Sequence, residues 1–492
     1  MGAKFTFIDL FAGIGGFYQG LSKYGGSSVG YSEINKDAIE TYCENYSEKQ
    51  ENNLGNITKI KELPPHDILT AGVPCQSWSI AGKNLGFDDD RGQLWNDTIY
   101  LLKESQPKAF IFENVKGLVD PRNKKALNYI LERIKKAGYF ANYYVINSHD
   151  YGVAQNRVRV YIIGFREERF FDAFKLPKPL EKKVKLADIL GVKVKKTTPQ
   201  PVAKDLFGNK IKSKNMSLSQ TNGFNDYFLF NDLRNGATTI HSWDILETTN
   251  RQKEICYLLL KNRRKSAYGK LDGNPLSLKH FQSLDSSISK KELKELVRLE
   301  IFKEVEYIFE VKKTKEELTE GEELLLSQSI KREIVLDELK TDKVLKLKSV
   351  SIPKTIASLK DKNILEVKEI RYEFKNSKIS TGLFGVNRIF LPNSDIFPTL
   401  VASDTNDYIT LKDIPHTSDY KEEFLKKVYL KNKYRKITKS EACKIQGFPT
   451  NFKLPESRAR WMKLIGNSVS VPVIEVLTRA IIDTEVFDSI DS

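Results

Sequence analysis

Over roughly the first 165 residues, short apolar runs typical of buried strands alternate with segments whose apolar residues repeat at helical spacing. A segment at 124–137 repeats Leu127, Ile130 and Ile134 at helical spacing. Strands joined by helices form crossover units, which build a doubly wound, mainly parallel sheet. We therefore expect an α/β fold whose ligands bind at the carboxyl ends of the strands. The apolar runs that we expect to be strands are Phe5–Phe11, Asp67–Ala71, Ala109–Phe112 and Val158–Gly164.

The length of 492 residues indicates more than one domain. The alternating pattern fades after Arg166, and a long polar stretch with Asn-Gly and Asp-Gly turns follows. We predict a first domain at 1–175, a second α+β domain at 176–454, and a segment at 455–492 that returns to the first domain. Within the second domain, the densely charged stretch 289–348 is interpreted as solvated helices. Near the end, Thr438 and Glu441 form a capping-box pattern before a short helix that Gly447 ends.

Charge and cysteine content narrow the class of protein. Lysine and arginine number 79 against 64 acidic residues, a net charge of +15. This excess favours a polyanionic partner such as nucleic acid, although a generally basic protein shows it too. The cysteines at 43, 75, 256 and 443 form no CxxC pair, so we expect no metal, no disulfide framework and a reducing compartment. No apolar run is long enough for a membrane span, and we expect a cytoplasmic protein without a signal peptide.

A glycine turn follows the first predicted strand. Gly13 and Gly15 let the backbone approach a ligand, but Tyr18 occupies the third glycine position of a dinucleotide fingerprint. The departure favours S-adenosylmethionine, which has no pyrophosphate to bind, over a nicotinamide cofactor. Glu33 ends a second apolar stretch, where a carboxylate accepts hydrogen bonds from ribose hydroxyls. A tight structural turn without a ligand is the alternative.

Five sequence blocks stand in a fixed order: Phe7–Phe17, Ala71–Ser79 with its Pro74-Cys75 pair, Phe112–Val115, Gln155–Arg159 and Gly466–Val469. Together they resemble the DNA (cytosine-5) methyltransferase family of the bacterial restriction-modification type. The resemblance implies a Rossmann-like S-adenosylmethionine-dependent catalytic domain and a larger-than-usual target recognition domain. It implies a cofactor pocket lined by Phe11, Ile14, Gly16, Glu33, Ile34, Asn56, Ile57, Pro74, Leu94, Asn467 and Val469. Asn56 stands where the family usually has an aspartate.

The chemistry of cytosine C5 explains the polar members of these blocks. C5 is a poor nucleophile, and a Cys75 thiolate that adds at C6 supplies the missing electron density. Glu113, with a pKa raised by burial, protonates or hydrogen-bonds the ring N3. Arg157 and Arg159 alternate on one strand and face one side; the resemblance directs Arg159 to the cytosine O2 and Arg157 to the catalytic loop or a phosphate. Taken singly, each of these residues has an ordinary structural explanation.

Double-stranded DNA is the expected substrate, with the target cytosine flipped out of the helix. By resemblance, Ser79 and Arg91 lie near the DNA backbone, and the region 176–434 reads the sequence. Within it, only Phe397–Ala402 resembles a recurrent family element. Further candidate DNA contacts are Arg234, Arg251, Arg263, Arg264 and Arg388.

Two other functions stay open at this point. A tRNA cytosine methyltransferase shares the catalytic blocks, although the large middle region speaks against it. A DNA-binding regulator that has kept the fold would not need the nucleophile Cys75. For the methyltransferase we expect a monomer, with a cognate restriction endonuclease that acts on the same site as a potential partner.

Overall fold

The protein comprises two compact units, one formed by 1–227 and 390–492 (unit 1) and one by 228–389 (unit 2). The computed structural model describes residues 4–74, 90–194, 227–229, 240–313, 315–380, 382–386, 388–392, 394, 396–405, 407–414 and 420–488. The predicted second domain, 176–454, is thus divided between the units: 176–227 and 390–454 belong to unit 1. The functional boundaries at 175 and 455 stay predictions.

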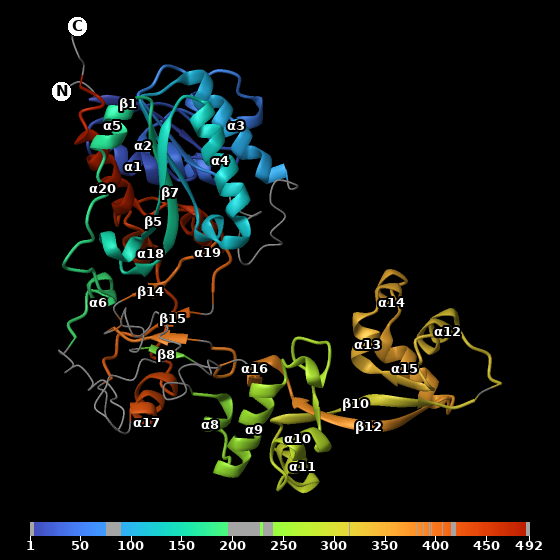
Figure 1. Ribbon diagram of the computed structural model, residues 1–492. Helices are drawn as coiled ribbons and strands as arrows, with labels where there is room; N and C mark the ends of the chain where they lie inside the picture. The colour runs from blue at the N-terminus through green and yellow to red at the C-terminus, as the bar shows by residue number, and fades with distance from the viewer. Residues whose placement is uncertain are drawn as a thin grey trace, which may run out of the picture. The chain divides into compact units, whose positions relative to one another are not determined.

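Unit 1 is built on a six-stranded sheet of order β2-β1-β3-β4-β7-β5 (Figure 1). Strands β2, β1, β3 and β4 are parallel neighbours, and β7 runs antiparallel to both β4 and β5. The predicted doubly wound, mainly parallel α/β fold is confirmed, as are the strand predictions. In chain order the strands are β1 (Phe5–Leu10), β2 (Gly26–Ser32), β3 (Ile68–Gly72), β4 (Ala109–Val115), β5 (Phe140–Asn147) and β7 (Val158–Phe165).

Both faces of this sheet are covered, because its central strands are apolar on both sides. In β4, Phe110 and Phe112 join one core cluster, whereas Ala109 and Ile111 join the other. The first cluster contains residues of α3 (Asp90–Ser105) and α4 (Lys124–Lys136), and the second those of α1 (Gly16–Ser22) and α20 (Val471–Ile482). Helix α2 (Lys36–Tyr46) follows β2, and α5 (Glu168–Ala173) follows β7.

The C-terminal helices complete unit 1. Helix α18 (Lys439–Gln446) begins at the predicted capping box, in which Thr438 N–H donates to Glu441 Oε2 at 2.8 Å, and ends at Gly447. Helices α19 (Arg458–Asn467) and α20 follow. The stretch 458–482 is long and apolar enough to pass a test for a membrane span, but 67% of its apolar 18-residue window is buried and α20 lies in the core of unit 1. A core helix passes the same test.

Unit 2 has an antiparallel sheet of order β11-β10-β12-β9. Its two apolar clusters lie at different parts of that sheet, one with α9, α10 and α11 and one with α12 to α15. The elements are α8 (Ser242–Ile245), α9 (Asn250–Asn262), β9 (Leu276–Ser277), α10 (Leu278–Leu284), α11 (Lys290–Arg298), β10 (Phe302–Val311), α12 (Glu320–Leu326), β11 (Glu333–Val335), α13 (Leu336–Thr341), α14 (Lys343–Leu347), α15 (Ile352–Asp361), β12 (Leu365–Phe374) and α16 (Ser377–Ser380).

The interpretation of 289–348 as helices is therefore only partly right. Helices occur there, but β10 is a ten-residue strand at the centre of the unit 2 sheet, and β11 pairs with it. The reason lies in the side chains: Phe302, Tyr307 and Phe309 are buried aromatic residues separated by exposed charges. Aromatic and β-branched residues pack well on a pleated, half-buried surface, which outweighs the helical preference of the glutamates.

Smaller elements connect these parts. A two-stranded parallel ladder joins β6 (Gln155–Asn156) to β14 (Phe397–Pro398) within unit 1. A three-stranded sheet has the order β15-β13-β8. Its strands and the remaining helices are β8 (Tyr227–Leu229), β13 (Arg388–Phe390), β15 (Asp407–Ile409), α6 (Leu186–Leu190), α17 (Tyr420–Phe424) and a π-helix at Leu425–Tyr429.

Gly447 is a position where the fold excludes a side chain. Its φ is +90°, and a Cβ there would lie 2.1 Å from Pro472 Cδ. We expect Gly447→Ala to lower the free energy of unfolding by more than the roughly 1–2 kcal/mol of a left-handed residue alone, because the clash adds to it. Urea denaturation measures the change. Gly138→Ala is the matched control, since Gly138 has φ +93° but nothing within 4 Å; equal losses in the two variants would contradict the clash.

Candidate active site

The turn after β1 has a backbone that few residues adopt. Phe11, Gly13 and Gly15 have φ values of +55°, +57° and +79°. A bulky residue such as Phe11 in the left-handed region carries strain that the surrounding structure must hold in place. One such hold is the hydrogen bond from Gly13 N–H to Glu33 Oε2, 2.8 Å, which joins the carboxyl ends of β1 and β2. The turn is thus a preformed cradle at the edge where this fold binds ligands.

Glu33 is oriented by the backbone around it. Besides the bond to Gly13, its Oε1 accepts from the N–H groups of Ile34 and Asn35, both at 2.8 Å. These contacts hold the carboxylate in one orientation while leaving acceptor capacity for a ligand. The neighbouring Ile34 side chain is 70% exposed, an apolar surface beside a fixed carboxylate. A nucleoside presents the complementary pair, a flat apolar base and ribose hydroxyls.

The C-terminal turn 466–469 lies against the start of α1. A Cβ on Gly16 would come within 2.6 Å of Val469 Cγ2 and 2.8 Å of Ser468 Oγ. The glycine is therefore required by a close approach, and the predicted cofactor residues Gly16 and Val469 are in contact. Asn467 lies in the same turn with an exposed side chain.

The remaining predicted cofactor residues gather near this edge. Phe11 and Leu94 are partly buried against the apolar cluster that contains Ile57. Asn56 caps a short 3₁₀ turn, since its Oδ1 accepts from the N–H of Thr58 at 3.0 Å. Pro74 follows β3 and is half-buried, whereas the Ile14 side chain is 1% exposed, so Ile14 can meet a ligand through its backbone.

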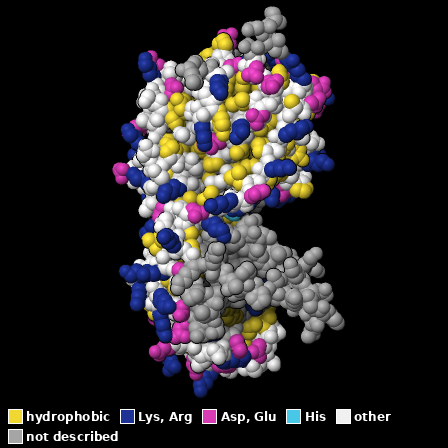
Figure 2. Space-filling view, turned by 90° about the vertical axis from the view of Figure 1, so that its left-hand side faces the viewer, with side chains coloured by type: hydrophobic (Ala, Val, Ile, Leu, Met, Phe, Trp, Pro, Cys, Tyr) yellow, Lys and Arg dark blue, Asp and Glu magenta, His cyan; other side chains and the backbone are white. Residues whose placement is uncertain are grey.

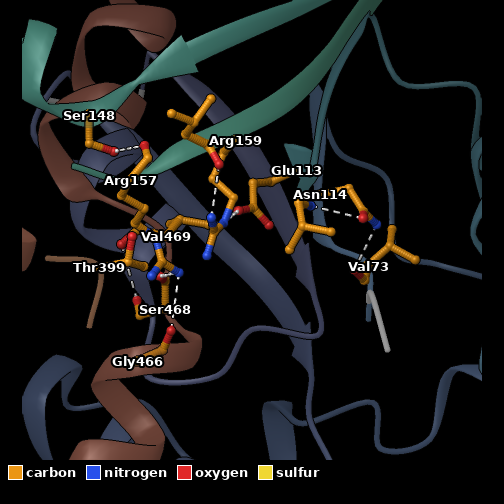
Figure 3. Close-up of polar contacts among 12 residues, drawn as sticks. Val73, Glu113, Asn114, Ser148, Arg157, Arg159, Thr399, Gly466, Ser468 and Val469 are labelled. Carbon is orange, nitrogen blue, oxygen red and sulfur yellow. Dashed lines mark hydrogen bonds and ion pairs between the residues drawn. The ribbon is translucent and has the colours of Figure 1, made fainter. Parts of the chain in front are cut away.

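Glu113 and Arg159 form an ion pair on adjacent strands. Val115 of β4 is paired with Arg159 of β7, so Glu113 is the diagonal neighbour of Arg159 on the same face. The distance from Arg159 Nε to Glu113 Oε1 is 3.0 Å, and the two side chains are 16% and 12% exposed. Figure 3 shows both side chains directed toward each other.

Opposing effects act on the Glu113 carboxyl. Burial raises its pKa above the ordinary value, and the positive charges of Arg159 and Arg157 lower it by less. A carboxyl with a raised pKa stays protonated to a higher pH, which suits a proton donor.

Asn114, the neighbour of Glu113 in β4, contacts the backbone that follows β3. Its side chain, 1% exposed, donates from Nδ2 to the carbonyl of Val73 at 3.1 Å (Figure 3). Val73 is followed by Pro74 and then by Cys75, so this bond fixes the backbone just before the predicted nucleophile. Cys75, Ser79 and Arg234 lie outside the described residues, as does the side chain of Arg91.

Comparison with known proteins identifies the family. The family model of the C-5 cytosine-specific DNA methylases matches residues 5–316 and 251–483. The chain belongs to this family. It is 40% identical to the type II methyltransferase M.HgiBI of Herpetosiphon aurantiacus over 99% of this chain and 98% of that one. It is 28% identical to M.NlaIV of Neisseria lactamica over 98% and 99%, and 41% identical to M.HpaII of Haemophilus parainfluenzae over 45% and 62%.

The family confirms several predictions from the sequence. This methylase is a DNA (cytosine-5-)-methyltransferase of the type II restriction-modification class, and its family depends on S-adenosylmethionine. No comparison tests the role of an individual residue, so the site residues stay predictions that the geometry can only support.

Arg157 of the methylase makes contacts that the sequence did not indicate. The side chain is 2% exposed and donates to the carbonyls of Leu400, Gly466 and Ser468 at 3.1, 3.1 and 2.7 Å (Figure 3). These are main-chain acceptors within unit 1, and the expected contact of Arg157 with the catalytic loop or a phosphate stays a prediction. A catalytic role of Arg157 stays a prediction, and the described contacts give this side chain a structural role.

The arginines predicted to bind DNA differ in their surroundings. All three guanidinium nitrogens of Arg251 are engaged, by Glu292, Asp285 and Ser287. Arg263 pairs with Glu373 at 3.3 Å and lies over the Phe374 ring. Arg264 forms an exposed pair with Asp272, and Arg388 is partly buried. Of these four, Arg264 is the one whose charge is most accessible to a phosphate, and DNA binding by each stays a prediction.

Sequence reasoning missed four polar residues that shape this site: Asn114, Gln155, Gln446 and Tyr46. Asn114 and Gln155 stand inside quoted blocks, and a polar side chain in an apolar strand was the available signal. Tyr46 donates its hydroxyl proton to the Gly15 carbonyl at 2.8 Å, and its ring closes the space over that glycine. No sequence pattern pointed to Tyr46 or Gln446, because their partners lie far away in the chain.

We expect Glu113→Gln to lower the rate of methyl transfer about 10²- to 10⁴-fold, the usual range for a general acid. Because the acid form is the active one, the wild-type rate should fall as pH rises through the raised pKa of Glu113. The variant should lack this fall, since an amide does not titrate. Single-turnover rates across pH test this, with urea denaturation as the control for folding; an unchanged pH profile in the variant would contradict the role of Glu113.

Proposed function

We propose that this chain transfers a methyl group from S-adenosylmethionine to C5 of a flipped-out cytosine, within a specific double-stranded DNA sequence. The reaction proceeds through a covalent bond between Cys75 and C6. The observation that carries the proposal is the buried Glu113–Arg159 pair, 3.0 Å apart, beside the end of β3, after which the chain continues through Val73 and Pro74 to Cys75. An acid, a cation and a nucleophile are the groups that this addition needs.

The residues at the carboxyl edge of the sheet fit an adenosyl cofactor. The Glu33 carboxylate is positioned to accept from ribose hydroxyls, and exposed Ile34 offers an apolar surface to the adenine. The turn at Phe11–Gly16 brings backbone close to the ligand, and Val469 lies against Gly16 at the end of this turn. When bound, the cofactor supplies an electrophilic methyl group on a sulfonium.

The residues of the chain then act in sequence. The Cys75 thiolate bonds to C6, and the electron pair of the C5–C6 double bond becomes available at C5 as Glu113 protonates or hydrogen-bonds N3. Arg159 holds the Glu113 carboxyl and is predicted to reach the cytosine O2. After C5 has gained the methyl group, its proton leaves to a base, the double bond re-forms, the C6–sulfur bond breaks, and a proton given to N3 returns to Glu113. Cys75 is thereby regenerated as a thiolate.

Recognition of the target belongs to the region between the two ends of unit 1. We propose that unit 2 and the segments 176–227 and 390–434 read the DNA, that the protein acts as a cytoplasmic monomer, and that a cognate restriction endonuclease cuts the same site. Full-length similarity to type II methyltransferases supports DNA rather than tRNA as the substrate.

A basic surface on α11 supports DNA contact by unit 2. Lys290, Lys291, Lys294 and Arg298 are exposed around a shallow hollow of about 530 Å³. None of them has an ion-pair partner within the part of the chain that the structure describes. Elsewhere, basic and acidic side chains are interspersed, as on the face drawn in Figure 2. Cations near a helix N-terminus are also unfavourable for the helix itself, which points to a role in binding.

Replacing these four residues of α11 with glutamine should weaken binding to non-target duplex and flatten its salt dependence. Each lost phosphate contact lowers the slope of log K against log salt by about 0.9. Fluorescence anisotropy at several salt concentrations measures this slope. The control carries Lys340, Lys343, Lys346 and Lys354→Gln, the same charge change at exposed positions outside the hollow. Equal slopes in the two variants would assign the effect to net charge and remove α11 from the interface.

The proposed reaction is tested by bisulfite sequencing of plasmid DNA from cells that express the wild type or Cys75→Ser. We expect conversion-resistant cytosines in one short motif with the wild type alone. DNA with 5-fluorocytosine in that motif should trap a covalent adduct. A base can remove the C5 hydrogen as a proton but cannot remove fluorine, so Cys75 is not eliminated. Marks on tRNA instead of DNA would favour the tRNA methyltransferase, and DNA binding without marks or adduct would favour a regulator.

A further inference from the structure

A fully buried group of polar side chains joins four segments of unit 1 that are distant in sequence. Its members, Gln155, Arg157 and Gln446, are 0%, 2% and 0% exposed. The segments that they connect are 154–157, 397–400, 445–446 and 466–469. Buried amides and guanidinium groups are costly unless hydrogen-bonded, so such a network holds its members in one arrangement.

Gln155 is the centre of the network. Its Nε2 donates to the Gln446 Oε1 at 2.8 Å and to the Ile445 carbonyl at 3.1 Å. Its Oε1 accepts from the N–H of Leu400 at 3.0 Å, while Arg157 binds the carbonyl of the same residue. Both polar groups of Leu400 are therefore held by side chains, directly after the β6–β14 ladder.

Gln446 extends the network to the C-terminal turn. Its Nε2 donates to the Ser468 carbonyl at 2.6 Å, and Arg157 donates to the same oxygen at 2.7 Å. On the other side, Gly466 packs directly on the backbone of residues 401–402, since a Cβ at Gly466 would lie 2.5 Å from the Val401 carbonyl carbon. The turn 466–469 is thus clamped between α18 and residues 400–402.

That turn also lies against the cofactor cradle, through Val469 and Ser468 at Gly16. A shift of residues 397–402 would therefore pass to the turn through Leu400, Gln155 and Gln446. Residues 397–402 belong to the region that is predicted to read DNA, and the turn carries the predicted cofactor residues Asn467 and Val469.

We infer that Gln155 and Gln446 are positioning residues for methyl transfer, which set the placement of turn 466–469 over the cofactor site and transmit to it the position of segment 397–402. The inference rests on the proposed function, because it assumes that the cradle binds S-adenosylmethionine. Neither glutamine touches the reacting atoms. Their effect is on cofactor affinity and on its coupling to DNA binding.

The first test uses the variant Gln446→Met in the full chain, because methionine keeps the shape of the side chain without its hydrogen bonds. The variant should fold, since Ser468 keeps its bond from Arg157 and Gln155 keeps its bond to Ile445. We expect the Kd for S-adenosylmethionine, measured by calorimetry without DNA, to rise about 3- to 10-fold, as for the loss of one or two buried hydrogen bonds. The KM for the cofactor should rise equally, with kcat changed less than twofold.

Gln446→Glu separates the two contacts of this side chain. The carboxylate keeps an acceptor for Gln155 but places an acceptor against the Ser468 carbonyl, so cofactor affinity should fall at least as far as in Gln446→Met. Target DNA should tighten cofactor binding in the wild type and do so less in both variants. An unchanged Kd and unchanged coupling in both variants would overturn the inference.

Tyr139→Phe is the matched control, because it removes a buried hydrogen bond, from the Tyr139 hydroxyl to the Pro107 carbonyl at 2.7 Å, elsewhere in unit 1. If Tyr139→Phe is as stable as Gln446→Met, it should bind the cofactor with the affinity of the wild type. A weaker affinity in this control would mean that the glutamines act only through general stability. If the wild type itself failed to bind S-adenosylmethionine, the proposed function would fail, and not the inference alone.

Discussion

The buried guanidinium of Arg157 is the contact on which the arrangement of unit 1 depends. A cation in the interior is costly unless its donors are used, and here they meet the carbonyls of Leu400, Gly466 and Ser468. Two of these acceptors belong to the end of α19, where the helix carries partial negative charge. Arg157, which lies between β6 and β7, thus connects residue 400 to the turn 466–469. Together with the bond from Gln446 to the Ser468 carbonyl, this connection holds Val469 close to Gly16.

The predicted catalytic pair, Glu113 and Arg159, lies close enough to Arg157 to be influenced by its charge. Glu113 is buried enough for desolvation to raise its pKa, yet two arginines lower it in part. The result is a carboxyl that can hold a proton while remaining hydrogen-bonded and oriented by Arg159. A salt bridge in water would have lost that proton, and an isolated buried acid would have lost its orientation. The sheet core excludes most water from the two side chains, and the adjacent strands β4 and β7 fix their positions relative to each other.

Unit 2 follows a different physical plan. Some of its charges are paired with one another, as at Arg251 and Arg371, and its two apolar clusters make it a compact body of its own. The exposed cations of α11 line a common hollow and have no ion-pair partner among the described residues, and such a cluster of positive charge attracts a polyanion.

From the sequence alone one could predict four of the six strands of the unit 1 sheet, namely β1, β3, β4 and β7, helix α18 with its cap, and the blocks that identify the family. These features are local: apolar runs, a capping box and short motifs act within a few residues. Sequence reasoning misjudged 302–311, where alternating aromatics sit among glutamates and pairing with β12 decided for a strand. Three contacts follow from the tertiary structure and could not be predicted from the sequence. Arg157 donates to main-chain carbonyls, Arg251 pairs with Asp285 and Glu292, and Gln155 donates to Gln446. The physical reason is that a buried polar side chain takes whichever partner the fold brings to it, here 291 residues away along the chain.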